Sequence, residues 1–324
     1  MTCAGETESA PRCLSTAATG VRRATLLTDD GVPIEARYEP SPAPGGEPSG
    51  PLALVVGHGF TGALERPALR RVASAFRQRT AVITFSFRGH GRSGGRSTVG
   101  DREVLDLAAA VRWARRLGHR RVATVGFSMG GSVVIRQAAL YRPHEDIRPM
   151  HGVHEGERAV HNEERTGRSQ GRTERIGGAA PGAASGAASD ATLDAAPDAV
   201  VAVSAPARWY YRGTAPMRRV HWAVTRPAGR LVSRYGLRTR IDPRGWGVDP
   251  LPPVAAAPLI APTPLLIVHG DRDPYFPLDH PRMLASAADP ASTELWIEPG
   301  YGHAETAASP ALLTRIADWA ATHA

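Results

Sequence analysis

The apolar residues of this chain gather in short unbroken runs, and between the runs they recur every three or four positions. A run such as Leu52–Val56 is apolar at every position, which is typical of a strand in a parallel sheet with both faces covered. A recurrence of three or four is typical of an amphipathic helix. We therefore predict an α/β fold with a mostly parallel, doubly wound sheet and helices on both faces. The predicted strands are Leu52–Val56, Ala81–Phe85, Arg121–Gly126, Ala199–Ser204, Leu265–His269 and Glu294–Ile297.

The helical patterns lie between these strands. In the clearest pattern, over residues 101–117, Leu107 and Val111 share one face, Asp101 is expected to cap the N-terminus, and Gly118 is expected to end the helix. Two strands joined by a short turn are expected before the first apolar run. The predicted helices are Pro67–Gln78, Asp101–Leu117, Ser132–Tyr141 and Leu312–Thr322, and the predicted hairpin pairs Val21–Thr28 with Val32–Glu39.

Two internal segments break the alternation. Residues 145–197 begin polar and charged and end in a run of Gly, Ala and Ser, so they bury little apolar surface and are predicted to be a disordered, low-complexity insertion. Residues 206–257 hold scattered aromatic residues, among them Trp209 and Trp222, and are predicted to form short amphipathic helices outside the sheet, as a cap. The expected remainder is a disordered leader over residues 1–20 and an α/β core made of residues 21–144, 198–205 and 258–324.

Charge is concentrated in the predicted cap. The chain has 324 residues and a formal net charge of +8, and all of its 39 basic residues are Arg. Ten of them lie in residues 207–246, where Asp242 is the one acidic residue, whereas the rest of the chain holds 29 Arg and 30 acidic residues. No DNA-binding motif accompanies the charge, so nucleic-acid binding is not expected. We hypothesise instead that the cap steers or clamps an anionic substrate, a carrier-linked acyl group or an acidic membrane surface.

Composition excludes two other classes of protein. No apolar run approaches the roughly 18–20 residues of a membrane span. The two cysteines, Cys3 and Cys13, are too few for the disulfide framework of a small secreted scaffold. The first 20 residues contain no basic stretch followed by an apolar one, so no signal peptide is recognised and a cytoplasmic location is predicted.

The string Gly126-Phe127-Ser128-Met129-Gly130 carries the clearest chemistry. It has the form Gly-x-Ser-x-Gly, directly after a predicted strand and before a helical run, which is the setting of a nucleophile elbow. So sharp a turn strains the backbone of the serine and needs small residues two positions before and after it, here Gly126 and Gly130. It also aims a helix N-terminus at the reaction centre, where the helix dipole favours negative charge. Ser128 is therefore the predicted nucleophile.

A serine is a weak nucleophile until a histidine accepts its proton and a carboxylate orients that histidine. Both residue types follow predicted strands near the C-terminus. Asp271 and Asp273 come after Leu265–His269, and His303 comes after Glu294–Ile297. Because the carboxyl ends of parallel strands meet at one edge of a sheet, where ligands bind, we expect these side chains near Ser128. His303 is the predicted base, and one of the two aspartates is the predicted acid.

Acyl transfer also needs two backbone N–H groups that face the oxygen where negative charge develops. Met129, directly after the serine, is expected to supply one. The other is expected from the loop after Leu52–Val56, which contains His58, Gly59 and Phe60. Phe60 is the predicted donor.

Together these motifs resemble those of the α/β-hydrolase family. The resemblance covers residues 52–322, except for the insertion and the cap. The insertion departs from the family pattern. It implies the chain order Ser, Asp, His for the triad, and the family pattern Gly-x-x-Asp implies that Asp273 is the acid and Asp271 a loop carboxylate. It also implies a serine hydrolase of small carboxylic esters or thioesters that uses no cofactor. The matching segments are His58-Gly59-Phe60, Phe87–Ser93, Gly126–Gly131, Gly270–Asp273 and Gly302-His303.

Alternatives remain open at this level. An acyltransferase, an amidase or a cofactor-free perhydrolase would use the same triad. The competing class is a non-catalytic binding protein on a hydrolase scaffold, which usually lacks a triad residue. Among the other histidines, His58 and His90 are expected to be buried, hydrogen-bonded loop residues. His151, His154 and His161 match no established metal-site spacing, so no metal is expected.

Overall fold

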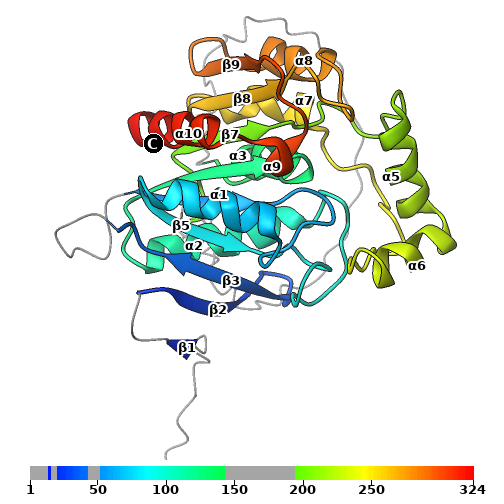
Figure 1. Ribbon diagram of the computed structural model, residues 1–324, viewed down its shortest axis with the longest axis horizontal. Coiled ribbons are helices and arrows are strands. Elements are labelled where there is room, and N and C mark those ends of the chain that lie inside the picture. The colour runs from blue at the N-terminus through cyan, green and yellow to red at the C-terminus, as the bar shows by residue number, and fades with distance from the viewer. Residues whose placement is uncertain (1–13, 16–19, 43–51, 143–193) are drawn as a thin grey trace, which may run out of the picture.

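One mixed sheet forms the centre of the molecule. The computed structural model describes residues 14–15, 20–42, 52–142 and 194–324. Its strands in these ranges are β1 (Leu14–Ser15), β2 (Arg22–Leu27), β3 (Pro33–Glu39), β4 (Leu52–Gly57), β5 (Ala81–Phe85), β6 (Arg121–Phe127), β7 (Ala199–Val203), β8 (Leu265–Gly270) and β9 (Thr293–Glu298). They pair in the order β1-β2-β3-β5-β4-β6-β7-β8-β9 (Figure 1). The strands β5, β4, β6, β7, β8 and β9 pair in parallel with their neighbours in this order. At one edge of the sheet, β1, β2 and β3 pair antiparallel with one another, and β3 pairs antiparallel with β5.

The burial of each strand follows its sequence pattern. Every residue of β4, β5, β7 and β8 is buried, because these unbroken apolar strands are covered on both faces. Near the edge, β3 alternates buried and more exposed positions, as a strand with one face toward the core does. The predicted hairpin is confirmed as β2 and β3.

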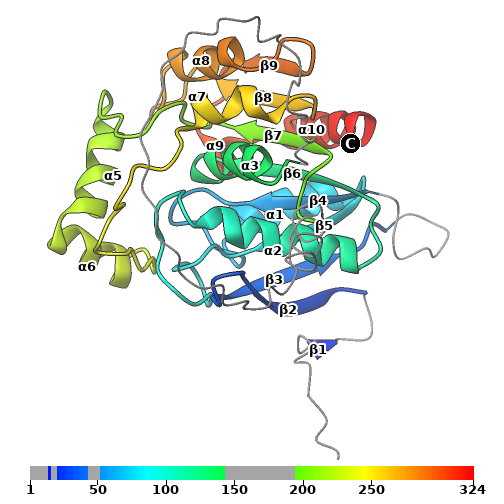
Figure 2. The same cartoon turned by 180° about the vertical axis from the view of Figure 1, so that it is seen from behind.

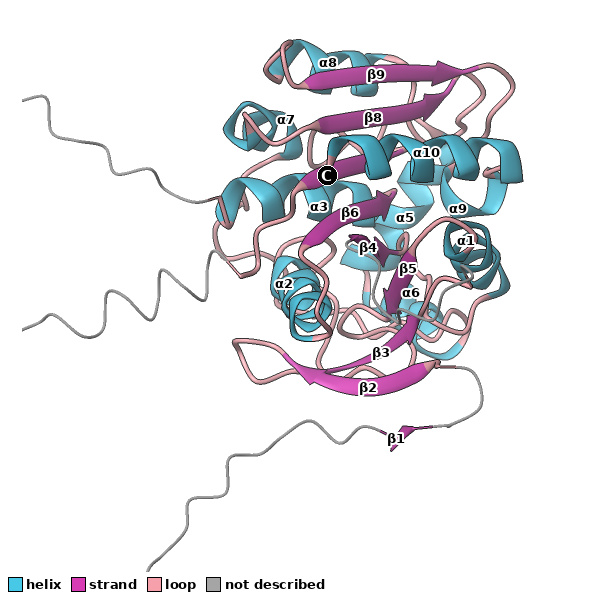
Figure 3. Cartoon of the chain, turned by 90° about the vertical axis from the view of Figure 1, so that its left-hand side faces the viewer, coloured by secondary structure: helices cyan, strands magenta, loops and turns pink. Residues whose placement is uncertain are grey.

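Helices cover the two faces of the sheet in separate layers (Figure 3). Each layer has its own apolar core against the strands. The first layer holds α1 (Pro67–Arg77), α9 (Ala304–Ala307) and α10 (Pro310–His323). The second holds α2 (Glu103–Arg116), α3 (Met129–Leu140), α7 (Pro253–Ala256), a 3₁₀ turn (Ala257–Ile260) and α8 (Asp279–Ala287). Within the described ranges, no helix has both the length and the apolar character needed to cross a membrane.

Two further helices, α5 (Ala215–Thr225) and α6 (Pro227–Tyr235), lie outside the sheet. In the sequence they fall between β7 and β8. Figures 1 and 2 show them at one end of the molecule. They lie within residues 206–257, the segment predicted to form a cap. The pair packs closely because α6 brings Gly229 against α5, where a Cβ would lie 2.3 Å from the carbonyl oxygen of Trp222.

The chain after α6 is tied back to the core. Thr239 and Ile241 form isolated β-bridges with His90 and Ser97, respectively. The N–H of Ser97 also donates to the carbonyl of Arg240 at 2.7 Å. These backbone bonds hold residues 239–241 of the cap against the loop that follows β5.

The structure moves three predicted helix starts, and the smallest change is in α10, which begins at Pro310 rather than Leu312. α2 begins at Glu103, and Asp101 does not cap it; the Asp101 carboxylate pairs instead with Arg136 at 3.3 Å. The Glu103 carboxylate serves this end of the helix by accepting N–H groups of the preceding loop. α3 begins at Met129 rather than Ser132, because the glycines that resemble a loop in sequence are held in a helix by close packing on the sheet.

The predicted leader and insertion lie largely outside the described residues. Within the leader, Leu14–Ser15 form β1 and pair with Arg22 and Arg23, so the prediction of disorder over residues 1–20 is wrong for these two. Backbone pairing at a sheet edge needs no apolar pattern in the added strand. Of the predicted insertion, residues 145–197, all but the last four positions are outside the described ranges.

Candidate active site

Ser128 occupies a sharp turn at the carboxyl end of β6. Its backbone angles are φ 51° and ψ −112°, a conformation that a residue with a side chain adopts only under strain. Its N–H donates to the carbonyl of Val203 at 2.8 Å. A Cβ on Gly126 would lie 2.1 Å from the carbonyl oxygen of Gly130, and one on Gly130 would lie 2.5 Å from that of Gly57. Close backbone packing therefore requires both glycines around the serine.

The structure brings Ser128, His303 and Asp273 together from distant parts of the chain. His303 Nε2 lies 2.9 Å from Ser128 Oγ, and His303 Nδ1 lies 2.7 Å from Asp273 Oδ2. The Asp273 side chain is fully buried, whereas that of His303 is 14% exposed. When Nδ1–H donates to the carboxylate, Nε2 carries a lone pair that faces the serine hydroxyl. Such an arrangement can accept the proton of Ser128 as its oxygen attacks a substrate.

The two candidate aspartates differ sharply in their surroundings. Asp273 Oδ1 accepts the backbone N–H groups of Tyr275 at 2.8 Å and Phe276 at 3.1 Å, so Oδ2 is left to face His303. The Tyr275 ring also stacks on the imidazole, with 4.3 Å between ring centroids. Asp271 is exposed and accepts the backbone N–H of Gly300, from the loop after β9, at 2.6 Å. Of the two, Asp273 alone is in contact with His303.

The loop after β4 lies against the serine. A Cβ on Gly59 would lie 3.4 Å from Ser128 Cβ. His58 braces the loop: its Nδ1–H donates to the carbonyl of Gly59 at 2.7 Å, and its Nε2 accepts the N–H of Phe87 at 3.0 Å. Burial lowers the pKa of His58 to about 3, and a second ring proton would also face the Phe87 N–H. The neutral, buried His58 positions Phe60, which follows Gly59 and lines the cavity beside Ser128.

Glu305 is a buried carboxylate at the site for which the sequence offers little signal. Its Oε1 accepts the N–H of Gly59 at 3.1 Å, so it joins the loop after β4 to the segment that carries His303. The residue is 7% exposed, and burial raises the pKa of its carboxyl. Its one sequence signal is its position two residues after His303, because α9 has only four residues and no periodic pattern.

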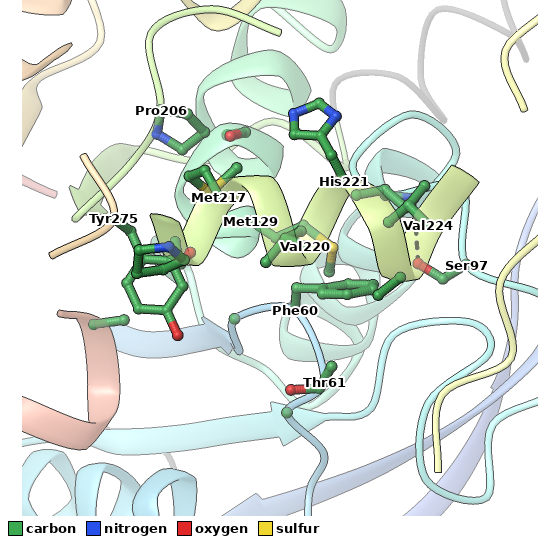
Figure 4. Close-up of a pocket in the computed structure, with 18 of the residues that line it drawn as sticks. Phe60, Thr61, Ser97, Met129, Pro206, Met217, Val220, His221, Val224 and Tyr275 are labelled. Carbon is green, nitrogen blue, oxygen red and sulfur yellow. Dashed lines mark hydrogen bonds between the residues drawn. The ribbon is translucent and has the colours of Figure 1, made fainter. Parts of the chain in front are cut away.

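A cavity of about 1030 Å³ opens beside Ser128 under the cap. Figure 4 shows Val220 of α5 lying over Phe60 and beside Met129. The cap thus forms the roof of the cavity, and the loop after β4 and the elbow form its floor. Aromatic side chains from the cap and from the loop after β8 make the lining mostly apolar, as in pockets for small organic molecules. They include Trp209, Tyr210, Tyr211, Trp222, Trp246, Tyr275 and Phe276.

The remaining histidines form no metal centre in the described part of the chain, where no group of three or more His, Cys, Asp or Glu side chains is arranged to hold an ion. His90 and His269 are fully buried, and burial lowers the pKa of both imidazoles. His151, His154 and His161 lie outside the described residues.

Known proteins share the fold of this chain. The Alpha/beta hydrolase family matches residues 52–315. The Pyrococcus furiosus esterase Pf2001 aligns with a TM-score of 0.60 at 18% identity, over 94% of each chain. The α/β hydrolase GrgF from Penicillium sp. sh18 aligns with a TM-score of 0.60 at 17% identity, over 94% of this chain and 98% of that one. Est1E from Butyrivibrio proteoclasticus, solved with ferulic acid, aligns with a TM-score of 0.52 at 18% identity, over 93% of this chain and 99% of that one. No curated protein matches the chain.

Proposed function

This chain belongs to the alpha/beta hydrolase family, and we propose that it is a serine hydrolase that cleaves carboxylic esters or thioesters. The observation that carries the proposal is the hydrogen-bonded series Ser128–His303–Asp273, with links of 2.9 Å and 2.7 Å. The three side chains lie in a geometry suited to acyl transfer, which argues against a binding protein that has lost its catalytic groups. The shared fold of the esterase Pf2001 also supports ester hydrolysis.

In the acylation half, Ser128 Oγ attacks the substrate carbonyl carbon while His303 Nε2 accepts the hydroxyl proton. The ionised Asp273 carboxylate stabilises the imidazolium that forms. The carbonyl oxygen becomes an oxyanion, and we assign the backbone N–H groups of Phe60 and Met129 as its donors. His303 then gives its proton to the departing oxygen or sulfur as that bond breaks, which leaves an acyl group on the serine.

In the deacylation half, water takes the place of the serine hydroxyl. His303 Nε2 accepts a proton from water as the water oxygen attacks the acyl carbonyl, and the proton then passes to Ser128 Oγ as the carboxylic acid leaves. One cycle therefore consumes one ester and one water and releases an acid and an alcohol or thiol. An acyltransferase would use another acceptor at this second step, so product analysis separates it from a hydrolase.

The cavity indicates the kind of substrate. Its aromatic and aliphatic lining favours an apolar acyl or aromatic group over a charged one at the reacting end. We therefore expect kcat/KM for p-nitrophenyl esters to rise from acetate to hexanoate, because longer chains bury more apolar surface.

Labelling with a fluorophosphonate tests the nucleophile. The reagent should modify Ser128, and Ser128→Ala should lose labelling and lower kcat/KM for p-nitrophenyl butyrate by about 10⁴-fold or more. Ser132→Ala, one helical turn along α3, is the matched control and should still be labelled. Circular dichroism checks that both variants fold. Labelling at another residue, or substantial turnover by folded Ser128→Ala, would overturn the assignment.

A further inference from the structure

The cap helix α6 exposes its large apolar side chains and buries its small ones. Leu231 is 58% exposed, Val232 52% and Tyr235 73%. The buried residues of the helix are Gly229 and Ser233, which pack toward the rest of the cap. A surface helix of a globular protein normally has the opposite arrangement, with its apolar stripe against the core. The apolar face of α6 therefore has no partner within the described chain.

Exposed apolar side chains are concentrated in the cap as a whole. Ten large apolar side chains are exposed in the described residues, and seven of them belong to the cap. Single exposed apolar residues are ordinary, but a contiguous group marks a surface that binds something. Three of the seven, Tyr210, Trp222 and Leu237, also line the cavity, so the exposed apolar side chains extend from α6 to the cavity. The seven are Tyr210, Trp222, Leu231, Val232, Tyr235, Leu237 and Val248.

Positively charged side chains lie along the same helix. Arginines recur every four residues from the start of α6 to just beyond its end, and residues 207–241 contain no acidic side chain. Among the described residues, the ion pairs of cap arginines are those of Arg208 and Arg244. The arginines along α6 therefore keep an uncompensated charge; they are Arg226, Arg230, Arg234 and Arg238.

We propose that the outer face of α6 docks on an anionic lipid surface. Leu231, Val232 and Tyr235 would enter the boundary between headgroups and acyl chains, and the arginines would contact the anionic headgroups, as in other interfacial amphipathic helices. A second copy of the chain fits less well, because a symmetric contact would oppose two sets of arginines with no acid between them. The docking surface stands on the cap alone, whereas its use in passing a lipid-dissolved ester to the cavity rests on the proposed function.

Vesicle co-sedimentation of the full chain tests the docking surface. The probes are vesicles of equimolar phosphatidylglycerol and phosphatidylcholine, and vesicles of phosphatidylcholine alone. The wild-type chain should bind the anionic vesicles, and salt should weaken that binding. Leu231→Ser with Tyr235→Ser should lower it about tenfold or more. Arg226→Gln with Arg234→Gln should lower it about 30-fold.

Matched variants outside the cap provide the controls. Leu27→Ser with Leu259→Ser removes two exposed apolar side chains, and Arg70→Gln with Arg120→Gln removes two exposed arginines. Both pairs should keep binding within about twofold, as surface changes away from an interface do. Equal binding to both vesicle types, no binding, or equal losses in the controls would overturn the proposal. So would a dimer in analytical ultracentrifugation that the cap variants dissociate.

Two further measurements keep this inference separable from the proposed function. Ser128→Ala should bind anionic vesicles as the wild type does, because docking does not use the nucleophile. The cap variants should hydrolyse soluble p-nitrophenyl butyrate as the wild type does, since Leu231, Tyr235, Arg226 and Arg234 do not line the cavity. Vesicle binding without any esterase activity would refute the proposed function alone, and esterase activity without vesicle binding would refute the docking surface alone.

Discussion

Replacing Asp273 with Asn should nearly abolish activity by fixing His303 in the wrong tautomer. Asp273 Oδ1 accepts two backbone N–H groups, at 2.8 Å and 3.1 Å, and Oδ2 accepts His303 Nδ1–H at 2.7 Å. Asn has one acceptor oxygen, and the two backbone donors are satisfied only when that oxygen takes the place of Oδ1. The amide NH₂ group then faces Nδ1, which must become an acceptor. The ring proton moves to Nε2 and points at Ser128 Oγ, so His303 can no longer accept the serine proton.

The size of the loss follows from the alternative arrangement. His303 regains the correct tautomer only if the amide flips, which sets its NH₂ group against two buried backbone donors. Each unsatisfied donor costs about 1–3 kcal/mol. Two of them cost about 2–6 kcal/mol, which lowers kcat/KM by about 30-fold to 10⁴-fold. The lost negative charge beside the imidazolium adds to this, so we expect a decrease near the upper end, about 10⁴-fold near neutral pH.

Steady-state hydrolysis of p-nitrophenyl butyrate measures this effect. Asp271→Asn is the matched control: its carboxylate is exposed and accepts one backbone N–H through Oδ1, an acceptor that Asn retains, so kcat/KM should stay within about threefold. Thermal unfolding verifies that both variants are folded. Folded Asp273→Asn with more than about a tenth of the wild-type kcat/KM would refute the tautomer argument, since a tenfold loss is about 1.4 kcal/mol and two unsatisfied donors cost at least about 2 kcal/mol.

Three further predictions concern buried polar groups. Glu305→Ala removes the acceptor of the Gly59 N–H and should lower kcat by up to about 100-fold with little change in KM, whereas Glu305→Gln should restore most of it. Asp106→Ala should lower the free energy of unfolding in urea by about 3–5 kcal/mol, because Arg88, 2% exposed, loses a carboxylate at 2.8 Å. Burial lowers the pKa of His58 to about 3 in the folded state, against an ordinary 6.5, so between these pH values the folded state binds fewer protons than the unfolded state. The contribution of His58 to the free energy of unfolding should therefore fall by about 1.4 kcal/mol for each pH unit below 6.5. His58→Gln should make the free energy of unfolding less dependent on pH in this range. A change confined to KM would contradict the prediction for Glu305. A loss of less than about 1 kcal/mol in the free energy of unfolding would contradict the prediction for Asp106. An unchanged pH dependence of the free energy of unfolding would contradict the prediction for His58.

The central strands could be predicted from the sequence because a strand buried on both faces tolerates few polar residues. The apolar runs that form β4, β5, β7 and β8 can therefore be recognised in the amino-acid sequence alone. The positions of Ser128, His303 and Asp273 follow from the same runs, since each residue comes directly after a strand whose end lies at the shared edge. The choice of Asp273 over Asp271 needed the family pattern, because both come after the same strand.

Features that depend on contacts between distant residues could not be predicted in this way. The Glu305 carboxylate meets the N–H of Gly59 across 246 residues of chain, and no local pattern encodes that approach. Asp101 resembles a helix cap in sequence but is drawn to Arg136 instead. The sequence pattern of α6 predicts an amphipathic helix, but it does not determine which face of the helix is exposed to solvent. The periodicity rule alone would have buried Leu231, which the structure exposes.

The part of the cap that contains α5 and α6 is a single excursion of the chain, and the core holds it at both ends. At its start, the N–H of Ala207 donates to His280 Nδ1 at 3.0 Å, and at its end Arg240 exchanges backbone hydrogen bonds with the loop after β5. The 208–238 interval between these two anchors contains α5 and α6 and no residue of the proposed triad. Residues 208–238 can therefore be replaced as a unit during evolution without changing the proposed triad. Recombination at the two anchors would give a descendant a new range of substrates while it inherited the proton-transfer apparatus unchanged.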